Sequence, residues 1–191
     1  KKNLKLVPFC IRPQAFEIPL DKQINREKMG LPKDKFTIVL AEGGYGIGKM
    51  QAICEEIIAQ DLPVTLIPVC GKNEELYEHF KTLKVGENTT FLPQGFCTTI
   101  LEYIASADLF LGKSGNIIAE PTFFGVPSIV TKHTTTIERT IAKYYVETVG
   151  CALNIFEVPD IIAKIKQFMQ GGEEYERLKQ NALAQHHNYG A

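Results

Sequence analysis

Short apolar runs alternate along the chain with longer amphipathic segments. The run FTIVLA at 36–41 is typical of a buried strand, and the segment at 49–60 places Ile53, Ile57 and Ile58 on one side of a helix. The same pattern predicts five further strands, at 64–70, 89–92, 109–111, 128–131 and 151–153. Further helices are predicted at 73–83, 98–107, 115–124, 137–146, 158–170 and 173–185.

This alternation indicates right-handed βαβ units. We therefore predict an α/β fold, a Rossmann-like doubly wound parallel sheet of six strands, over residues 36–191. Residues 1–35 do not follow the pattern, and we expect an arm or linker with one short helix at 22–29. Pro68 lies inside the second strand and predicts an edge strand or a bulge. Ligands of such sheets bind outside the carboxyl ends of the strands.

Composition narrows the class of protein. The 191 residues are 45% hydrophobic, enough for a sizeable core, and the net charge of -1 has no basic block, which disfavours nucleic acid as a partner. Five scattered cysteines without CxxC spacing fit the reducing cytoplasm and disfavour disulfides or a zinc site. No apolar run is long enough to span a membrane, and residues 1–10 do not resemble a signal peptide. Because the chain starts without Met, we interpret it as part of a longer protein.

A glycine-rich segment, GGYGIG at 43–48, separates the first predicted strand from a helix. Glycines at such a point let the backbone approach a phosphate. The segment is not a Walker A loop, because Met50 follows Lys49, and no acidic residue ends the second strand as an NAD site would require. The alternative is a tight turn without a ligand.

A second motif lies after the strand at 109–111. Lys113, Ser114, Gly115 and Asn116 precede a predicted helix that carries Glu120. The free N–H groups at a helix start attract anions, and a carboxylate further along can accept hydrogen bonds from sugar hydroxyls. This combination suggests a nucleoside diphosphate carrying a ribose or a hexose. The alternative for Glu120 is an ordinary solvated carboxylate.

The hydroxyl-rich segment TTTIER at 134–139 leads into another predicted helix. It fits an N-cap with Glu138 in the first turn as well as it fits a ligand contact, and both interpretations stay open.

Taken together, these motifs resemble the C-terminal half of the GT-B glycosyltransferases of family 28. That family includes the diacylglycerol glycosyltransferases, among them monogalactosyldiacylglycerol synthase, and the lipid II N-acetylglucosaminyltransferase. The resemblance runs from Phe9 to about Leu153. It rests on the strings FCIRP (9–13), REKMGLP (26–32), GGYGIG (43–48), VCGKN (69–73), GF (95–96), AD (107–108), KSG (113–115), AE (119–120) and GVP (125–127).

The resemblance implies a site for a UDP-sugar. Glu120 would bind the ribose hydroxyls, the backbone at Cys97 would read the uracil, and Arg12 would reach the nucleotide. The diphosphate and donor sugar would be held by further residues, namely Gly44, Tyr45, Gly46, Ser114, Gly115, Asn116, Thr136 and Glu138.

The implied reaction is attack of an acceptor hydroxyl on the anomeric carbon of the donor, with UDP leaving and no metal or other cofactor. The acceptor would be lipid-linked, so the protein would be cytoplasmic and associated with the inner membrane face. The family's general base lies in an N-terminal GT-B domain that this chain lacks. We therefore assign no catalytic residue here, and we expect the isolated chain to bind donor without turnover.

The chain departs from the family pattern at three points. The family has one more residue between Ser-Gly and the glutamate, and Pro121 stands where alanine is common. The family's sugar-contacting G-Q-E-x-x-N element has no exact match here, and TIERT at 136–140 stands in its place. Two alternatives remain: half of a UDP-N-acetylglucosamine 2-epimerase, suggested by Glu138-Arg139, and a non-catalytic nucleotide-sugar-binding subunit of a split glycosyltransferase.

Overall fold

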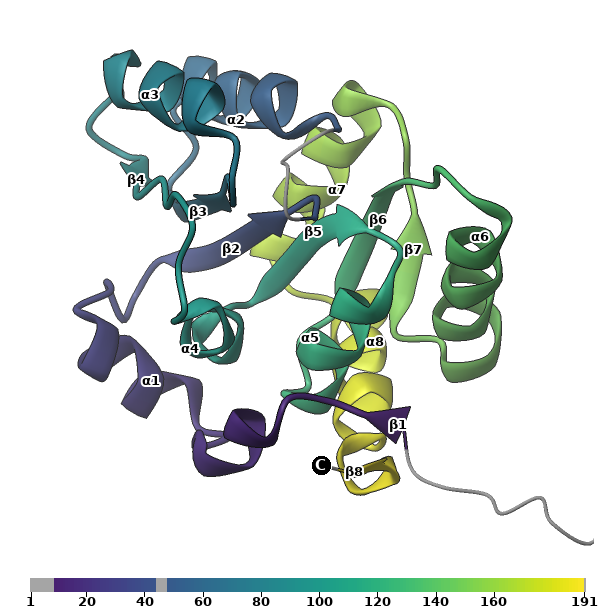
Figure 1. Cartoon of the computed structure of the whole chain (residues 1–191). Helices are drawn as coiled ribbons and strands as arrows, with labels where there is room; N and C mark the ends of the chain where they lie inside the picture. The colour runs from purple at the N-terminus through teal and green to yellow at the C-terminus, as the bar shows by residue number, and fades with distance from the viewer. Residues whose placement is uncertain (1–8, 44–47, 191) are drawn as a thin grey trace, which may run out of the picture.

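A computed structural model describes residues 9–43 and 48–190 of the chain. Its centre is a parallel sheet of six strands in the order β4-β3-β2-β5-β6-β7, which confirms the predicted fold class (Figure 1). The strands are β2 (Phe36–Ala41), β3 (Val64–Val69), β4 (Thr90–Phe91), β5 (Leu109–Lys113), β6 (Ser128–Lys132) and β7 (Ala152–Asn154). The order reverses between β2 and β5, because β3 and β4 extend from one side of β2 and the later strands from the other.

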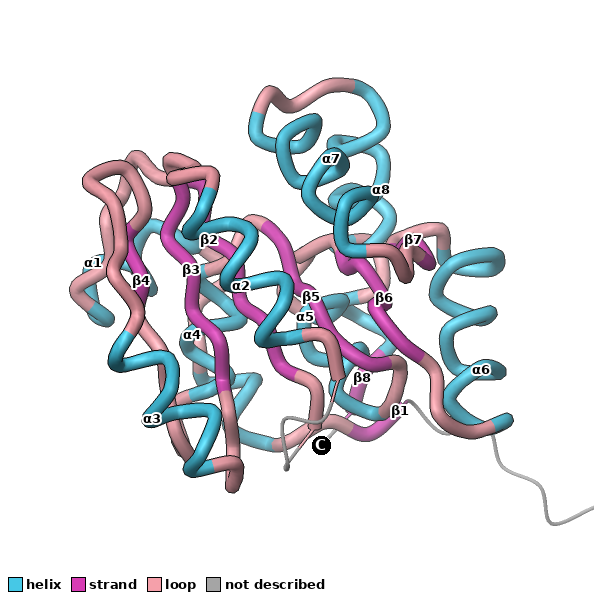
Figure 2. Tube along the Cα trace, turned by 90° about the horizontal axis from the view of Figure 1, so that it is seen from above, coloured by secondary structure: helices cyan, strands magenta, loops and turns pink. Residues whose placement is uncertain are grey.

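Helices cover both faces of the sheet (Figure 2). They are α1 (Lys22–Met29), α2 (Met50–Ala59), α3 (Glu74–Thr82), α4 (Ile100–Ser106), α5 (Ala119–Phe123), α6 (Thr136–Lys143), α7 (Val158–Met169) and α8 (Glu173–Leu183). Alternate residues of β2 enter different cores: Ile38 and Leu40 pack with α2, α3 and α7, whereas Val39 and Ala41 pack with α4 and α5. A strand buried on both faces reads as an unbroken apolar run, which is why FTIVLA has no polar alternation.

The N-terminal arm packs against the domain. Strand β1 (Phe9–Cys10) pairs in parallel with β8 (Tyr189–Gly190), so segments from the two ends of the chain lie side by side (Figure 1). The 3-10 helix η1 (Pro13–Glu17) follows β1, and α1 packs on α4. Gly30 ends α1 in the left-handed conformation (φ 65°), which glycine adopts without a steric penalty.

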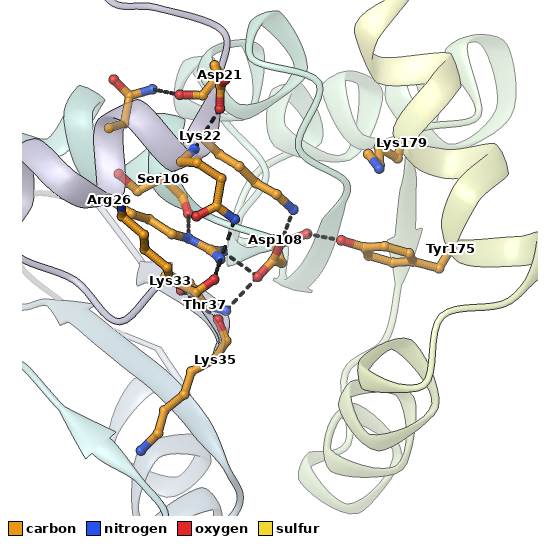
Figure 3. A network of polar contacts seen from close by, with 12 residues as sticks. Asp21, Lys22, Arg26, Lys33, Lys35, Thr37, Ser106, Asp108, Tyr175 and Lys179 are labelled. Atoms are coloured by element: carbon orange, nitrogen blue, oxygen red, sulfur yellow. Dashed lines mark hydrogen bonds and ion pairs between the residues drawn. The ribbon is translucent and has the colours of Figure 1, made fainter.

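A buried ion pair holds α1 in place (Figure 3). Arg26 Nη2 donates to Asp108 Oδ2 at 2.5 Å, and both residues are buried. The backbone N–H of Thr37 donates to the same oxygen at 2.8 Å, and Lys22 pairs with the other carboxylate oxygen. The hydroxyl of Tyr175 donates to the Asp108 carbonyl at 3.1 Å. Asp108 therefore joins the arm, β2 and α8 at the amino end of β5.

The expectation that Pro68 marks an edge strand or a bulge is wrong. Strand β3 lies between β2 and β4 and pairs with β2 in unbroken register. The Pro68 carbonyl accepts from Gln94 N at 2.8 Å, on the side of β3 that faces β4. The Pro68 nitrogen faces the same side but has no hydrogen to donate, so the regular pairing with β4 ends at Phe91, and Leu92 O accepts from Gln94 Nε2 at 3.2 Å instead. Backbone pairing resumes beyond this gap, where Cys70 N donates to Gln94 O at 2.8 Å.

Two predicted helices differ in their form. The segment predicted as one helix at 115–124 is a 3-10 turn, η2 (Asn116–Ile118), followed by the five-residue α5. Pro121 lies in the first turn of α5, where a helix needs no backbone N–H. Helix α6 continues into the π-helical turn η3 (Tyr144–Val149), and a last 3-10 turn, η4 (His186–Asn188), precedes β8. Within the described residues, no helix is both long and apolar enough to cross a bilayer.

Candidate functional site

A cleft of about 850 Å³ opens at the carboxyl ends of the central strands. It lies where the strand order reverses, between β2 and β5, which is the usual ligand site of open α/β sheets. Residues that follow β2, β3 and β5 line it together with the N-terminal arm and the start of α4. They include Cys10, Ile11, Arg12, Gln14, Gly43, Gly71, Phe96, Cys97, Leu101, Glu102, Asn116, Ile117 and Glu120.

Arg12 and Glu120 meet in this cleft although 108 positions separate them in the sequence. Arg12 donates through Nε to Glu120 Oε1 and through Nη2 to Oε2, each at 2.7 Å. The side chain of Glu120 is 10% exposed and the side chain of Arg12 is 43% exposed. A nearly buried carboxylate requires such a partner, and the two-point geometry fixes the plane of the carboxylate. Each oxygen keeps a lone pair for a further donor.

Two other predicted contacts lie in the same cleft. Asn116 is exposed at the start of η2, and Cys97 is half-buried in the loop before α4. Burial raises the pKa of the Cys97 thiol, so the side chain is a neutral group on the cleft wall. Phe96 beside it is 73% exposed and presents an aromatic ring at the cleft. The predicted contacts at Gly44, Tyr45 and Gly46 lie outside the described residues.

The predicted diphosphate ligand Ser114 is fully buried and is not among the described residues that line the cleft. Its Oγ lies 2.9 Å from Nδ1 of His133, so the hydroxyl already has a partner. Gly115 is half-buried and extended (φ -170°), and its carbonyl accepts from Ile118 N. Sequence reasoning placed Ser114 correctly after β5 but gave no sign of its contact with His133.

Thr136 and Glu138 lie at the start of α6, where the N-cap interpretation is confirmed. Thr135 is the N-cap and forms a capping box with Glu138. Glu138 also pairs with Lys113 at 3.1 Å and accepts from Thr134 N at 2.5 Å. Desolvation alone would raise the pKa of Glu138, but the Thr134 hydrogen bonds and the Lys113 cation outweigh it and hold the pKa at about 2. A contact between these residues and a sugar stays a prediction.

Glu42 is a residue of the site region that sequence reasoning missed. Its carboxylate is buried directly after β2, where Oε2 accepts from Met50 N at 2.8 Å and Oε1 accepts from the Thr131 hydroxyl at 2.7 Å. Glu42 therefore satisfies the first turn of α2 and joins β2 to β6. An added Cβ on Gly48 would lie 2.0 Å from Oε2, so the glycine makes room for this carboxylate. A glutamate between an apolar strand and a glycine-rich segment is the signal that could have identified it.

This doubly wound parallel sheet, with a cleft at its switch point, has the fold of one half of a GT-B glycosyltransferase. Comparison with protein-family models finds no match. Among curated proteins, the chain is 30% identical over 186 residues to a processive diacylglycerol beta-glucosyltransferase of Bacillus pumilus. It is 27% identical over 194 residues to a probable chloroplastic monogalactosyldiacylglycerol synthase of Glycine max.

These alignments cover 96% of this chain, but 48% of the Bacillus protein and 36% of the Glycine protein. The chain thus spans about half the length, or less, of the curated relatives it matches. The resemblance to diacylglycerol glycosyltransferases that the sequence motifs indicate is confirmed by these relatives.

Solved structures agree on the fold. WaaG, a glycosyltransferase involved in lipopolysaccharide biosynthesis, superposes with a TM-score of 0.68 at 19% identity, covering 96% of this chain and 52% of WaaG. HepE from Anabaena, solved in complex with UDP-glucose, superposes with a TM-score of 0.62 at 21% identity, covering 92% of this chain and 48% of HepE.

Proposed function

We propose that this chain is the donor-binding half of a glycosyltransferase that transfers a hexosyl group from a UDP-sugar to a hydroxyl of a diacylglycerol-type lipid. The observation that carries this proposal is the Glu120 carboxylate, held by Arg12 inside a cleft at the switch point of the sheet. The similarity to diacylglycerol glycosyltransferases over nearly the whole chain supports it.

The geometry of Glu120 suits a ribose. Arg12 occupies one lone pair on each carboxylate oxygen, which leaves one on each for the 2′- and 3′-hydroxyls of a ribose. The two hydroxyls would then donate side by side to one fixed carboxylate. Loss of either partner would leave a polar group of the cleft unpaired, which costs more than the hydrogen bond itself contributes.

The cleft also has an apolar part for a flat base. Phe96, Leu101 and Ile117 line it, and the backbone near Cys97 would supply the polar groups that a uracil edge requires. The volume of about 850 Å³ is in the range that binds nucleotide-sized ligands.

The proposed chemistry divides between two halves of a larger protein. This half would hold the donor and stabilise the negative charge that develops on the leaving UDP, with no cofactor besides the donor itself. An N-terminal GT-B domain would supply the general base and the acceptor site. The lipid acceptor would place the reaction at a membrane surface, and we propose a peripheral protein at the cytoplasmic face.

Calorimetric titration of the chain with UDP, GDP, ADP and NAD tests the donor assignment. We expect saturable binding of UDP in preference to the other three. Glu120→Gln should weaken UDP binding about tenfold, because the ribose hydroxyls lose a charged acceptor. Glu173→Gln, which removes an exposed charge at the start of α8, serves as the matched control and should bind UDP like the wild type. Equal binding of GDP, or an unaffected Glu120→Gln variant, would contradict the proposal.

A further inference from the structure

A second, smaller hollow of about 250 Å³ lies beside the cleft, at the carboxyl end of β6. Lys49, Thr131, Lys132, His133 and Phe156 line it. Three of these five residues carry a cation or a ring N–H. None of them is in the set of contacts implied by the motifs.

The two lysines that line the hollow differ in their partners. Lys132 lies opposite Lys113 in the register of β5 and β6, and like charges on adjacent strands repel each other. Lys113 is neutralised by Glu138. Among the described residues none forms an ion pair with Lys132, so its charge is uncompensated there.

Lys49 contributes a second cation to the lining of the hollow. Its ammonium donates to the Phe156 carbonyl and lies 3.5 Å from Glu157, whose side chain is 75% exposed. An exposed pair at this distance is weak and is easily exchanged for a better anion.

His133 is oriented by the contact with Ser114. The pKa of His133 is lowered by its partial burial and by the Arg139 cation, which favours the neutral form of the ring. When the buried Ser114 hydroxyl donates to Nδ1, the proton of the neutral ring resides on Nε2. No described residue hydrogen-bonds Nε2, and the His133 and Phe156 rings meet in a T-shaped arrangement with a centroid distance of 5.0 Å.

The hollow and the cleft are connected through neighbouring residues. Gly43 and Asn116 line the cleft, while Glu42 and Ser114, close to them in the chain, contact Thr131 and His133 of the hollow. This proximity in the chain would let a ligand whose nucleoside occupies the cleft reach the hollow with its phosphate groups.

We propose that Lys49, Lys132 and His133 form an anion subsite that takes the phosphoryl oxygens of a nucleoside diphosphate whose nucleoside occupies the cleft. This inference rests on the proposed function and extends it to residues that the family motifs do not include. Lys132 and Lys49 supply charge, and the His133 Nε2–H supplies a directed hydrogen bond. Ser114 is then a positioning residue for His133 rather than a direct phosphate ligand.

Binding of UDP and uridine to the wild-type chain and to Lys132→Ala and His133→Ala tests the subsite. We expect each substitution to weaken UDP about tenfold and to leave uridine unchanged, because uridine has no phosphate to lose a contact. Lys166→Ala, which removes an exposed cation from α7, is the matched control and should bind both ligands like the wild type.

Ser114→Ala distinguishes a positioning role from a direct one. In a double-mutant cycle, it should weaken UDP binding in the wild type and add nothing in the His133→Ala background. Full additivity of the two substitutions would contradict the positioning role.

Three results would overturn the subsite: unchanged UDP affinity in both variants, an equal loss for uridine and UDP, or inorganic phosphate binding as tightly as UDP. The last would indicate a general anion site unrelated to a nucleotide. A wild-type chain that binds neither uridine nor UDP would instead contradict the proposed function itself.

Discussion

Replacing Arg26 with methionine should destabilise the domain strongly, because it leaves the buried Asp108 carboxylate without its main cation. Arg26 is 3% exposed and Asp108 is 7% exposed, so water cannot take the place of the lost partner. Arg26 also donates to the Ser106 carbonyl at 2.9 Å, and that contact disappears with it. Breaking a buried pair by removing one partner costs about 3–5 kcal/mol. Lys22 and the Thr37 N–H remain on Asp108, so we expect the lower end, about 3 kcal/mol.

Urea unfolding followed by circular dichroism measures this effect. With a slope of about 2 kcal/mol/M, the midpoint should fall by about 1.5 M. Lys33→Met is the matched control, because it removes a cation of the same arm whose partner Glu27 is exposed. Its midpoint should equal that of the wild type within error. The reasoning is refuted if Arg26→Met and Lys33→Met unfold at the same urea concentration.

Two further predictions concern the surroundings of the site. Gly48→Ala should destabilise the domain by about 1–3 kcal/mol, because its Cβ would lie 2.0 Å from an oxygen of the Glu42 carboxylate, which two hydrogen bonds hold in place. An unchanged melting temperature would contradict this. Because the folded pKa of Glu138 is about 2 against an ordinary 4.5, its stabilising contribution is present above pH 4.5 and is lost as the pH falls toward 2. The stability difference between wild type and Glu138→Gln in urea unfolding should therefore shrink over that range, and a difference independent of pH would argue against the Lys113 and Thr134 contacts.

The sheet could be predicted because its strands are buried on both faces. Each of the six apolar runs corresponds to a strand, and 36–41 and 22–29 match the bounds of β2 and α1. The inference from Pro68 failed because β3 holds this proline inside the sheet, where the Gln94 side chain takes the place of the missing donor at Leu92 O. Whether such a substitute donor is present is decided by tertiary packing, which a single sequence does not encode locally.

The sequence predicts those site residues that belong to a local motif. It does not predict contacts between residues that are far apart in the chain. Glu120 and Cys97 were assigned on their motifs, and the structure places both in one cleft with Arg12. The two-point Arg12–Glu120 geometry has no local signal, because it depends on β1 pairing with β8 at the other end of the chain. The buried Ser114–His133 contact likewise depends on the register of β5 against β6.

The most direct test of the central claim is a crystal structure of the chain with UDP bound. The account predicts that the ribose hydroxyls lie within hydrogen-bond distance of the Glu120 carboxylate, that the uracil packs near Cys97 and Phe96, and that the phosphates point toward His133. UDP bound away from the Glu120 cleft, or bound there with its ribose turned away from the carboxylate, would contradict it.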